Sequence, residues 1–266
     1  MLGLVAVAAS PAEASTIESA VKNLDSSLNQ LITAKDEVGS GEELTPEEDL
    51  AFRKKVVNDA LILSLKEIDD IETKLNGFKF ADKSAENSVK KQFIADLGEF
   101  EGYYRDLQGK LDKESDVEKI KDMARGAKIY REETYSPIVA KALEFILAFQ
   151  TDKLVTGADV RYGKIETDIK KLEKADFIRT GFFSREMGES KKLISDARGL
   201  VEKAKSEVIS PDEGAKEDAS DEKATDAGKE VAPTPRELCE AALVNLKSSY
   251  GIFVEISASV KKILKL

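Results

Sequence analysis

The sequence predicts an all-α protein, an elongated antiparallel bundle of about six to seven long helices. Apolar residues recur at intervals of three and four over most of the chain, which is the spacing of one helix face. No useful stretch alternates between apolar and polar residues as a strand would, and no hairpin signal is present. Charged residues make up 35% and apolar residues 41% of the 266 residues, a composition typical of long helices with narrow buried stripes.

Clear start and stop signals delimit the first two helices. An aliphatic stripe predicts a helix over residues 15–38, which a Gly-Ser-Gly segment ends. Thr45 then supplies an N-cap, Pro46 fits the first helical position, and Glu48 completes a capping box. A second helix is therefore expected from this point to Asn76, which precedes a glycine.

Two further helices are expected over residues 84–113 and 115–135. The first of them contains Gly98, Gly102 and Gly109, and each glycine in a helix interior costs up to about 1 kcal/mol relative to alanine. Close packing of a neighbouring helix against these positions would explain why they are glycine.

The middle of the chain predicts the most buried helix. Ser136 and Pro137 are expected to cap and begin it, and residues 142–149 are apolar on almost every side. The helical pattern continues through Leu172, and a sixth helix is expected over residues 186–208.

Composition changes sharply after the sixth helix. Residues 210–235 are almost all charged, small or proline, so an acidic disordered linker is expected there. A second capping box, from Thr234 to Glu237, begins a C-terminal amphipathic helix over residues 236–266. Residues 15–209 would then form one bundle. The C-terminal helix would dock on that bundle, pair with another chain as an oligomer contact, or lie on a membrane surface.

The N-terminal residues suggest export. A short apolar run is followed by an A-x-A pattern at Ala12–Ala14, as at a signal-peptide cleavage site. A basic segment before the run is missing, so residues 1–14 are interpreted as a truncated signal peptide, with an alanine-rich leader as the alternative. The expected location is periplasmic, cell-surface or extracellular.

Several classes of chemistry lack their usual side chains. The chain contains no histidine, which excludes Ser–His–Asp and Cys–His nucleophile pairs and histidine-ligated metals. No phosphate-binding loop, GxSxG elbow or calcium loop occurs. We therefore expect a protein that is not an enzyme, with no catalytic, cofactor or metal site. The lone Cys239 is interpreted as a small apolar residue rather than a reactive thiol.

The charge pattern bears on the partners. The formal net charge is −10, and no cluster of lysine and arginine forms a basic face, so no nucleic-acid partner is expected. The lysines alternate with acidic residues, as on a solvated helix face.

One segment between the fifth and sixth helices is a candidate contact site. Three phenylalanines and two arginines lie close together there: Phe177, Arg179, Phe182, Phe183 and Arg185. Aromatic and arginine side chains are common anchors of binding interfaces, so the segment is a candidate contact for a partner or ligand. The alternative is a turn whose phenylalanines close the end of the bundle, since buried phenylalanine is ordinary.

Three functions follow as hypotheses. The first is a non-enzymatic structural or interaction protein of the cell envelope that binds a protein or surface partner. The second is a carrier of a lipid or small apolar ligand, which requires a cavity around Phe145 and Phe149. The third is peripheral membrane binding through the last helix, near whose end Lys261, Lys262 and Lys265 lie.

Four segments also carry a resemblance: Tyr130–Pro137, Phe145–Gln150, Ala158–Ile165 and Tyr250–Ser257. They resemble uncharacterised exported helical proteins from uncultured bacteria, over roughly residues 115–266. The resemblance implies export and an α-helical fold. It implies no activity and no functional residues.

Overall fold

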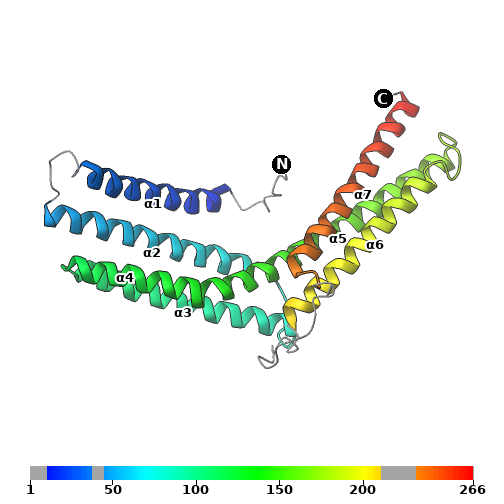
Figure 1. Ribbon diagram of the computed structural model, residues 1–266. Coiled ribbons are helices and arrows are strands. Elements are labelled where there is room, and N and C mark those ends of the chain that lie inside the picture. The colour runs from blue at the N-terminus through cyan, green and yellow to red at the C-terminus, as the bar shows by residue number, and fades with distance from the viewer. Residues whose placement is uncertain (1–10, 38–44, 211–231, 266) are drawn as a thin grey trace, which may run out of the picture. The chain divides into compact units, whose positions relative to one another are not determined.

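The computed structural model describes residues 11–37, 45–210 and 232–265, and every regular element in these ranges is a helix (Figure 1). The predicted all-α class is confirmed. Residues 1–10 of the expected leader lie outside the described residues, as do residues 211–231 of the expected linker.

The chain forms two compact units, which meet between Ala142 and Leu143. This boundary lies inside helix α5, Ser136–Lys174, and differs from the single bundle expected over residues 15–209. The helical pattern runs through the boundary without a break in composition, so nothing in the local sequence marks it. The two units are described separately below.

In the first unit, α1, Pro11–Glu37, packs against α2, Pro46–Asn76. The predicted capping box at the start of α2 is present. The Glu48 N–H donates to Thr45 Oγ1 at 3.2 Å, and the Thr45 N–H donates to Glu48 Oε2 at 2.9 Å. These bonds satisfy backbone donors that the first helical turn leaves free.

Helix α3, Ala85–Lys113, is capped by the Ser84 side chain and also packs against α2. Among the described residues, no atom beyond the local helix backbone lies within 4 Å of a Cβ atom placed on Gly98, Gly102 or Gly109. The explanation of these glycines by close packing is therefore wrong.

Helix α4, Val117–Tyr130, passes directly into a π-helical turn, η2, Arg131–Tyr135, and then into α5. Ser136 has helical dihedral angles, and its N–H donates to the carbonyl of Arg131, so its predicted role as the cap of a new helix is wrong. In a regular α-helix, the ring of Pro137 would collide with the carbonyl four residues earlier. The wider π turn lies immediately before this proline, and the chain stays helical through it.

The core of the first unit lies between α2, α3 and α4. It is made of apolar side chains that are almost fully buried: Val57, Leu61, Ile68, Ile71, Leu75, Leu97, Phe100, Tyr104, Leu111 and Ile120. Each buried Leu, Ile or Phe side chain contributes roughly 1.5–3 kcal/mol relative to an exposed one. Helix α2 contacts α1, α3 and α4, which makes it the central helix of this unit.

The second unit contains most of α5 with α6, Ser184–Ile209, and α7, Pro235–Leu264 (Figure 1). The predicted capping box of Thr234 and Glu237 begins α7. The start of α7 packs with Ala148 and Ala204, and Ile256 near its end packs with Ile169 of α5 and Met187 of α6. Helix α7 therefore runs parallel to α5 and antiparallel to α6.

Small residues allow α6 and α7 to approach closely. Ala197 and Ala242 are completely buried in one cluster, and the hydroxyls of Ser190 and Ser249 are hydrogen-bonded at 2.7 Å. The apolar face of α7 is thus packed against helices of its own chain. At its start, Cys239 is fully buried, and burial raises the pKa of its thiol, as for an unreactive apolar position.

Candidate functional site

The candidate segment forms the tip of the second unit, where the chain turns from α5 into α6. Helix α5 ends in a Schellman motif, in which the Phe177 N–H donates to the Leu172 carbonyl at 3.0 Å and the Asp176 N–H to the Glu173 carbonyl at 3.1 Å. Asp176 has φ = 57°, the left-handed conformation that such a C-cap requires. The chain therefore leaves the helix in a defined direction, with Phe177 as the first residue beyond it.

A tight turn follows over residues 179–182. The Phe182 N–H donates to the Arg179 carbonyl at 3.0 Å, and Gly181 has φ = 77°, as in a type II turn. The Gly181 N–H also donates to the Glu173 carboxylate at 2.7 Å, which ties the turn to the last turn of α5. These bonds hold the backbone of the tip in one shape.

Two apolar side chains anchor the tip to the unit below it. Ile178 and Phe183 are buried in a cluster with Ile169, Met187 and Ile256. Neighbouring residues in the tip therefore point in opposite directions, one into the core and the next into solvent. Ile178 was not among the predicted site residues. The signal that could have identified it is an aliphatic residue between Phe177 and Arg179, which is typical of a side chain that anchors a loop to the core.

The five predicted site residues divide between the two roles. Phe183 is buried and closes the end of the bundle, as the alternative interpretation expected. Phe177 and Phe182 instead remain 59% and 49% exposed. Arg179 and Arg185 are exposed as well, and Arg185 pairs with the adjacent Glu186 at 3.4 Å. The tip thus presents two aromatic rings and two guanidinium groups to solvent.

The end of α7 lies at the same end of the unit as the tip. Val260 packs against the cluster that holds Ile178 and Phe183, and the exposed residues Lys261 and Lys262 follow it directly. Ile263 is also exposed. Two segments far apart in the sequence therefore lie at the same end of the second unit.

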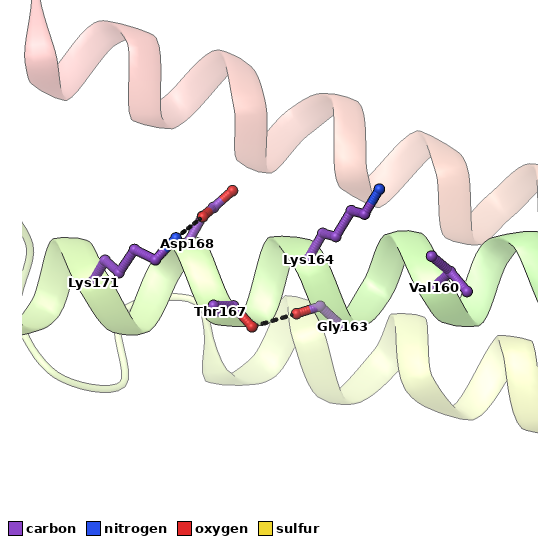
Figure 2. A pocket seen from close by; sticks show the side chains of 6 residues that line it. All are labelled: Val160, Gly163, Lys164, Thr167, Asp168 and Lys171. Atoms are coloured by element: carbon purple, nitrogen blue, oxygen red, sulfur yellow. Dashed lines mark hydrogen bonds and ion pairs between the residues drawn. The ribbon is translucent and has the colours of Figure 1, made fainter.

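An open hollow of about 390 Å³ lies on the outward face of α5 (Figure 2). All its lining residues come from this one helix: Val160, Gly163, Lys164, Thr167, Asp168 and Lys171. Lys171 pairs with Asp168 at 2.9 Å, and the Thr167 hydroxyl donates to the Gly163 carbonyl at 2.7 Å. Ligand sites normally enclose most of the ligand surface, and one exposed helix face does not do so.

The first unit contains a polar cluster that sequence reasoning missed. Arg131, on the π turn, donates to Ser64 Oγ at 2.9 Å and to Glu67 Oε2 at 2.8 Å. The Tyr135 hydroxyl donates to the same Glu67 oxygen at 3.3 Å, and the guanidinium lies 5.2 Å from the centre of the Tyr135 ring. The only sequence signal was an arginine close to a tyrosine, which does not identify a partner 64 residues away.

Aromatic rings surround this cluster. Tyr103 and Tyr130 are stacked with centroids 3.7 Å apart, and both are half-buried, as expected for residues at the edge of a helix stripe. Tyr104 is almost fully buried, and its hydroxyl makes no hydrogen bond within the described part of the chain. The nearby Ser64 hydroxyl lowers the pKa of Tyr104. The hydroxyl proton of Ser64 is itself donated to the Ala60 carbonyl.

Burial sets the protonation of these tyrosines. It raises the pKa of Tyr104 to about 12 and raises that of Tyr135 further above its usual value, where the charge of Glu67 adds to the effect. Both hydroxyls are therefore protonated at neutral pH and cannot act as bases. The arrangement is suited to joining α2, α3 and the π turn rather than to proton transfer.

The described ranges also bear on metal sites and membrane-spanning segments. No group of three or more acidic or cysteine side chains comes together there in a way that could hold a metal ion. No helix in the described parts of the chain has an apolar stretch long enough to cross a membrane.

Comparison with known proteins adds no relative: no family model, curated protein or solved structure matches this chain.

Proposed function

We propose that the protein is a non-enzymatic interaction protein of the cell envelope and that it contacts its partner through the tip of the second unit. The observation that carries the proposal is the exposure of Phe177 and Phe182 on a backbone held by hydrogen bonds and by the buried anchors Ile178 and Phe183. A pair of exposed rings on a fixed loop is a feature that core packing does not require.

The shape of the tip favours binding energetically. Covering a phenylalanine side chain contributes roughly 1.5–3 kcal/mol, so two rings supply a useful share of an interface. Because Asp176 and Gly181 already hold the backbone in its turns, little backbone ordering remains to oppose association. Arg179 and Arg185 can add charged hydrogen bonds at the rim of the same surface.

Two parts of the proposal, the envelope location and the lack of catalytic activity, are supported by the sequence alone. The apolar N-terminal run with its A-x-A pattern supports export, and the lack of histidine supports a role other than the common forms of acid–base or nucleophilic catalysis. The carrier hypothesis receives no support from Phe145 and Phe149, whose rings pack against each other with centroids 4.6 Å apart.

Photo-crosslinking in the producing cells tests the proposal. A diazirine-bearing amino acid, which reacts with proteins and lipids alike, replaces Phe182 in the full chain. The control carries it at Val244, a side chain of α7 that is 64% exposed but lies outside the tip. We expect covalent adducts from position 182 and few from position 244. Equal labelling from both positions, or none from position 182, would contradict a contact function of the tip.

A further inference from the structure

The charge at the tip is opposite to that of the chain as a whole. Residues 174–185 and 261–265 together contain six lysines and arginines and one carboxylate, although the formal net charge of the chain is −10. Packing of Val260 on the tip cluster brings the two segments to the same end of the second unit. The local field at this end is therefore positive on a protein that is otherwise acidic.

The two carboxylates that directly adjoin residues 174–185 both have a partner. Glu173 accepts the Gly181 N–H at 2.7 Å, and Glu186 pairs with Arg185 at 3.4 Å. Arg179, Lys261 and Lys262 are exposed and form no ion pair with a carboxylate of the described residues, so their charge faces solvent. The cations thus remain available to an anionic partner.

The exposed apolar side chains at this end of the second unit project into solvent from a loop and a helix end. Phe177 and Phe182 project from the loop between α5 and α6, and Ile263 is exposed near the end of α7. Projecting rings on a protein partner would each need a matching pocket. A bilayer interface is deformable and accepts such rings without a preformed pocket, while its anionic headgroups attract the surrounding cations.

The buried face of α7 rules out a different way of reaching a membrane. Leu246, Phe253 and Ile256 are packed against α5 and α6, so a docked α7 cannot lay its apolar face on a bilayer. The contact has to come from the end of the unit, where rings and cations are both exposed.

We infer that the tip of the second unit, together with the end of α7, binds the surface of an anionic lipid bilayer. Phe177 and Phe182 enter the interfacial region, and Arg179, Lys261 and Lys262 lie over the lipid phosphates. This inference rests on the proposed function, because it names the partner of the same surface.

Vesicle co-sedimentation of the full chain tests the inference. The probes are vesicles of phosphatidylcholine alone and of an equimolar mixture with phosphatidylglycerol. We expect binding to the anionic vesicles that weakens with added salt, and little binding to the neutral ones. The double variant F177S/F182S should weaken anionic binding by about tenfold or more, because two apolar groups no longer enter the interface.

Matched controls separate the tip from the rest of the surface. The double variant V244S/V254S removes two exposed aliphatic side chains of α7 outside the tip and should bind as the wild type does. The triple variant R179Q/K261Q/K262Q should weaken binding about a hundredfold, at roughly fivefold for each charge. K110Q/R125Q/K128Q changes the net charge equally at exposed sites of the first unit and should leave binding unchanged.

All substituted side chains are exposed, and thermal unfolding followed by circular dichroism will verify that each variant folds. No binding to anionic vesicles, equal binding to neutral vesicles, or equal losses in the tip and control variants would overturn the inference. If position 182 cross-links to a protein while vesicles do not bind, the proposed contact function stands and the bilayer is not the partner. An absence of adducts from position 182 removes the contact function itself.

Discussion

Arg131 and Glu67 form an ion pair of 2.8 Å that joins the π turn to the central helix α2 of the first unit. The same guanidinium binds Ser64, and the same carboxylate accepts the Tyr135 hydroxyl. The pair is therefore the centre of a network that fixes where the π turn sits along α2. Both side chains are partly solvated, so the network contributes to stability without the full cost of burying two charges.

Removing either partner of this pair should destabilise the protein. Arg131→Met and Glu67→Gln are each expected to lower the free energy of unfolding by about 1 kcal/mol, since one charged group loses its hydrogen bonds in a half-buried site. Urea unfolding of both single variants and the double variant gives the coupling free energy. The exposed Glu18–Lys22 pair is the control, where Lys22→Met should change stability by less than about 0.5 kcal/mol. Additive losses at Arg131 and Glu67 would show that the two residues are not coupled.

Replacing Tyr104, whose hydroxyl has no hydrogen-bond partner among the described residues, should not destabilise the fold. Tyr104→Phe removes a buried polar group that makes no hydrogen bond, so stability should stay the same or rise by up to about 1 kcal/mol. Tyr135→Phe provides the comparison, because it removes the hydrogen bond to Glu67 and should cost about 1 kcal/mol. Chemical unfolding of both variants measures the difference. A loss at Tyr104 as large as that at Tyr135 would mean that its hydroxyl is bonded in solution.

Tyr104 also predicts how stability changes in alkaline solution. Burial raises its pKa from 10.0 to about 12, so the folded protein holds this proton more tightly than the unfolded chain does. The resulting stabilisation is fully present below pH 10 and is lost as the pH rises towards 12, by about 3 kcal/mol in total. Tyr104→Phe should reduce this loss when unfolding is compared at about pH 9 and about pH 11. An unchanged slope in the variant would exclude Tyr104 as its source.

Alanine is expected to have opposite effects at Gly181 of the tip and at Gly102 of α3. Gly181→Ala forces a side chain into a position with φ = 77°, where its Cβ would lie 3.2 Å from Ser184 Oγ, and should cost about 1 kcal/mol or more. Gly102→Ala, inside α3 with no other part of the described chain within 4 Å, should stabilise the protein by up to about 1 kcal/mol.

Asp176→Gly should also stabilise the protein, because glycine adopts φ = 57° more easily than aspartate. Thermal unfolding distinguishes these signs, and a neutral Gly181→Ala would contradict the fixed turn.

Local features were the most predictable parts of the fold. The capping boxes at Thr45 and Thr234 each depend on hydrogen bonds between residues three positions apart, so the sequence alone contains everything that forms them. The end of α2 at Asn76, before a glycine, was equally predictable, and α3 begins one residue after its predicted start. The passage through Pro137 was not predicted, because a proline after a serine also fits the beginning of a helix.

The candidate site was predicted only in part. The sequence indicated that residues 177–185 combine aromatic rings with arginines, but it could not say which rings face solvent. Phe182 and Phe183 are neighbours with opposite exposure, and the turn around Gly181 decides which of them points inward. The position of the end of α7, where Val260 packs against the cluster that anchors the tip, depends on how α7 packs along α5 and α6, which no local pattern specifies.

The sequence by itself determined the helical class, most helix ends and the apolar face of each helix, because periodicity and capping act within a few residues. Only the tertiary structure decided which helix each face meets, where the chain divides into two units, and that Arg131 finds Glu67. The physical reason is that an apolar stripe gains almost the same free energy of burial against any of several neighbouring helices. Side-chain fit between particular helices, together with a few specific polar contacts, selects one arrangement.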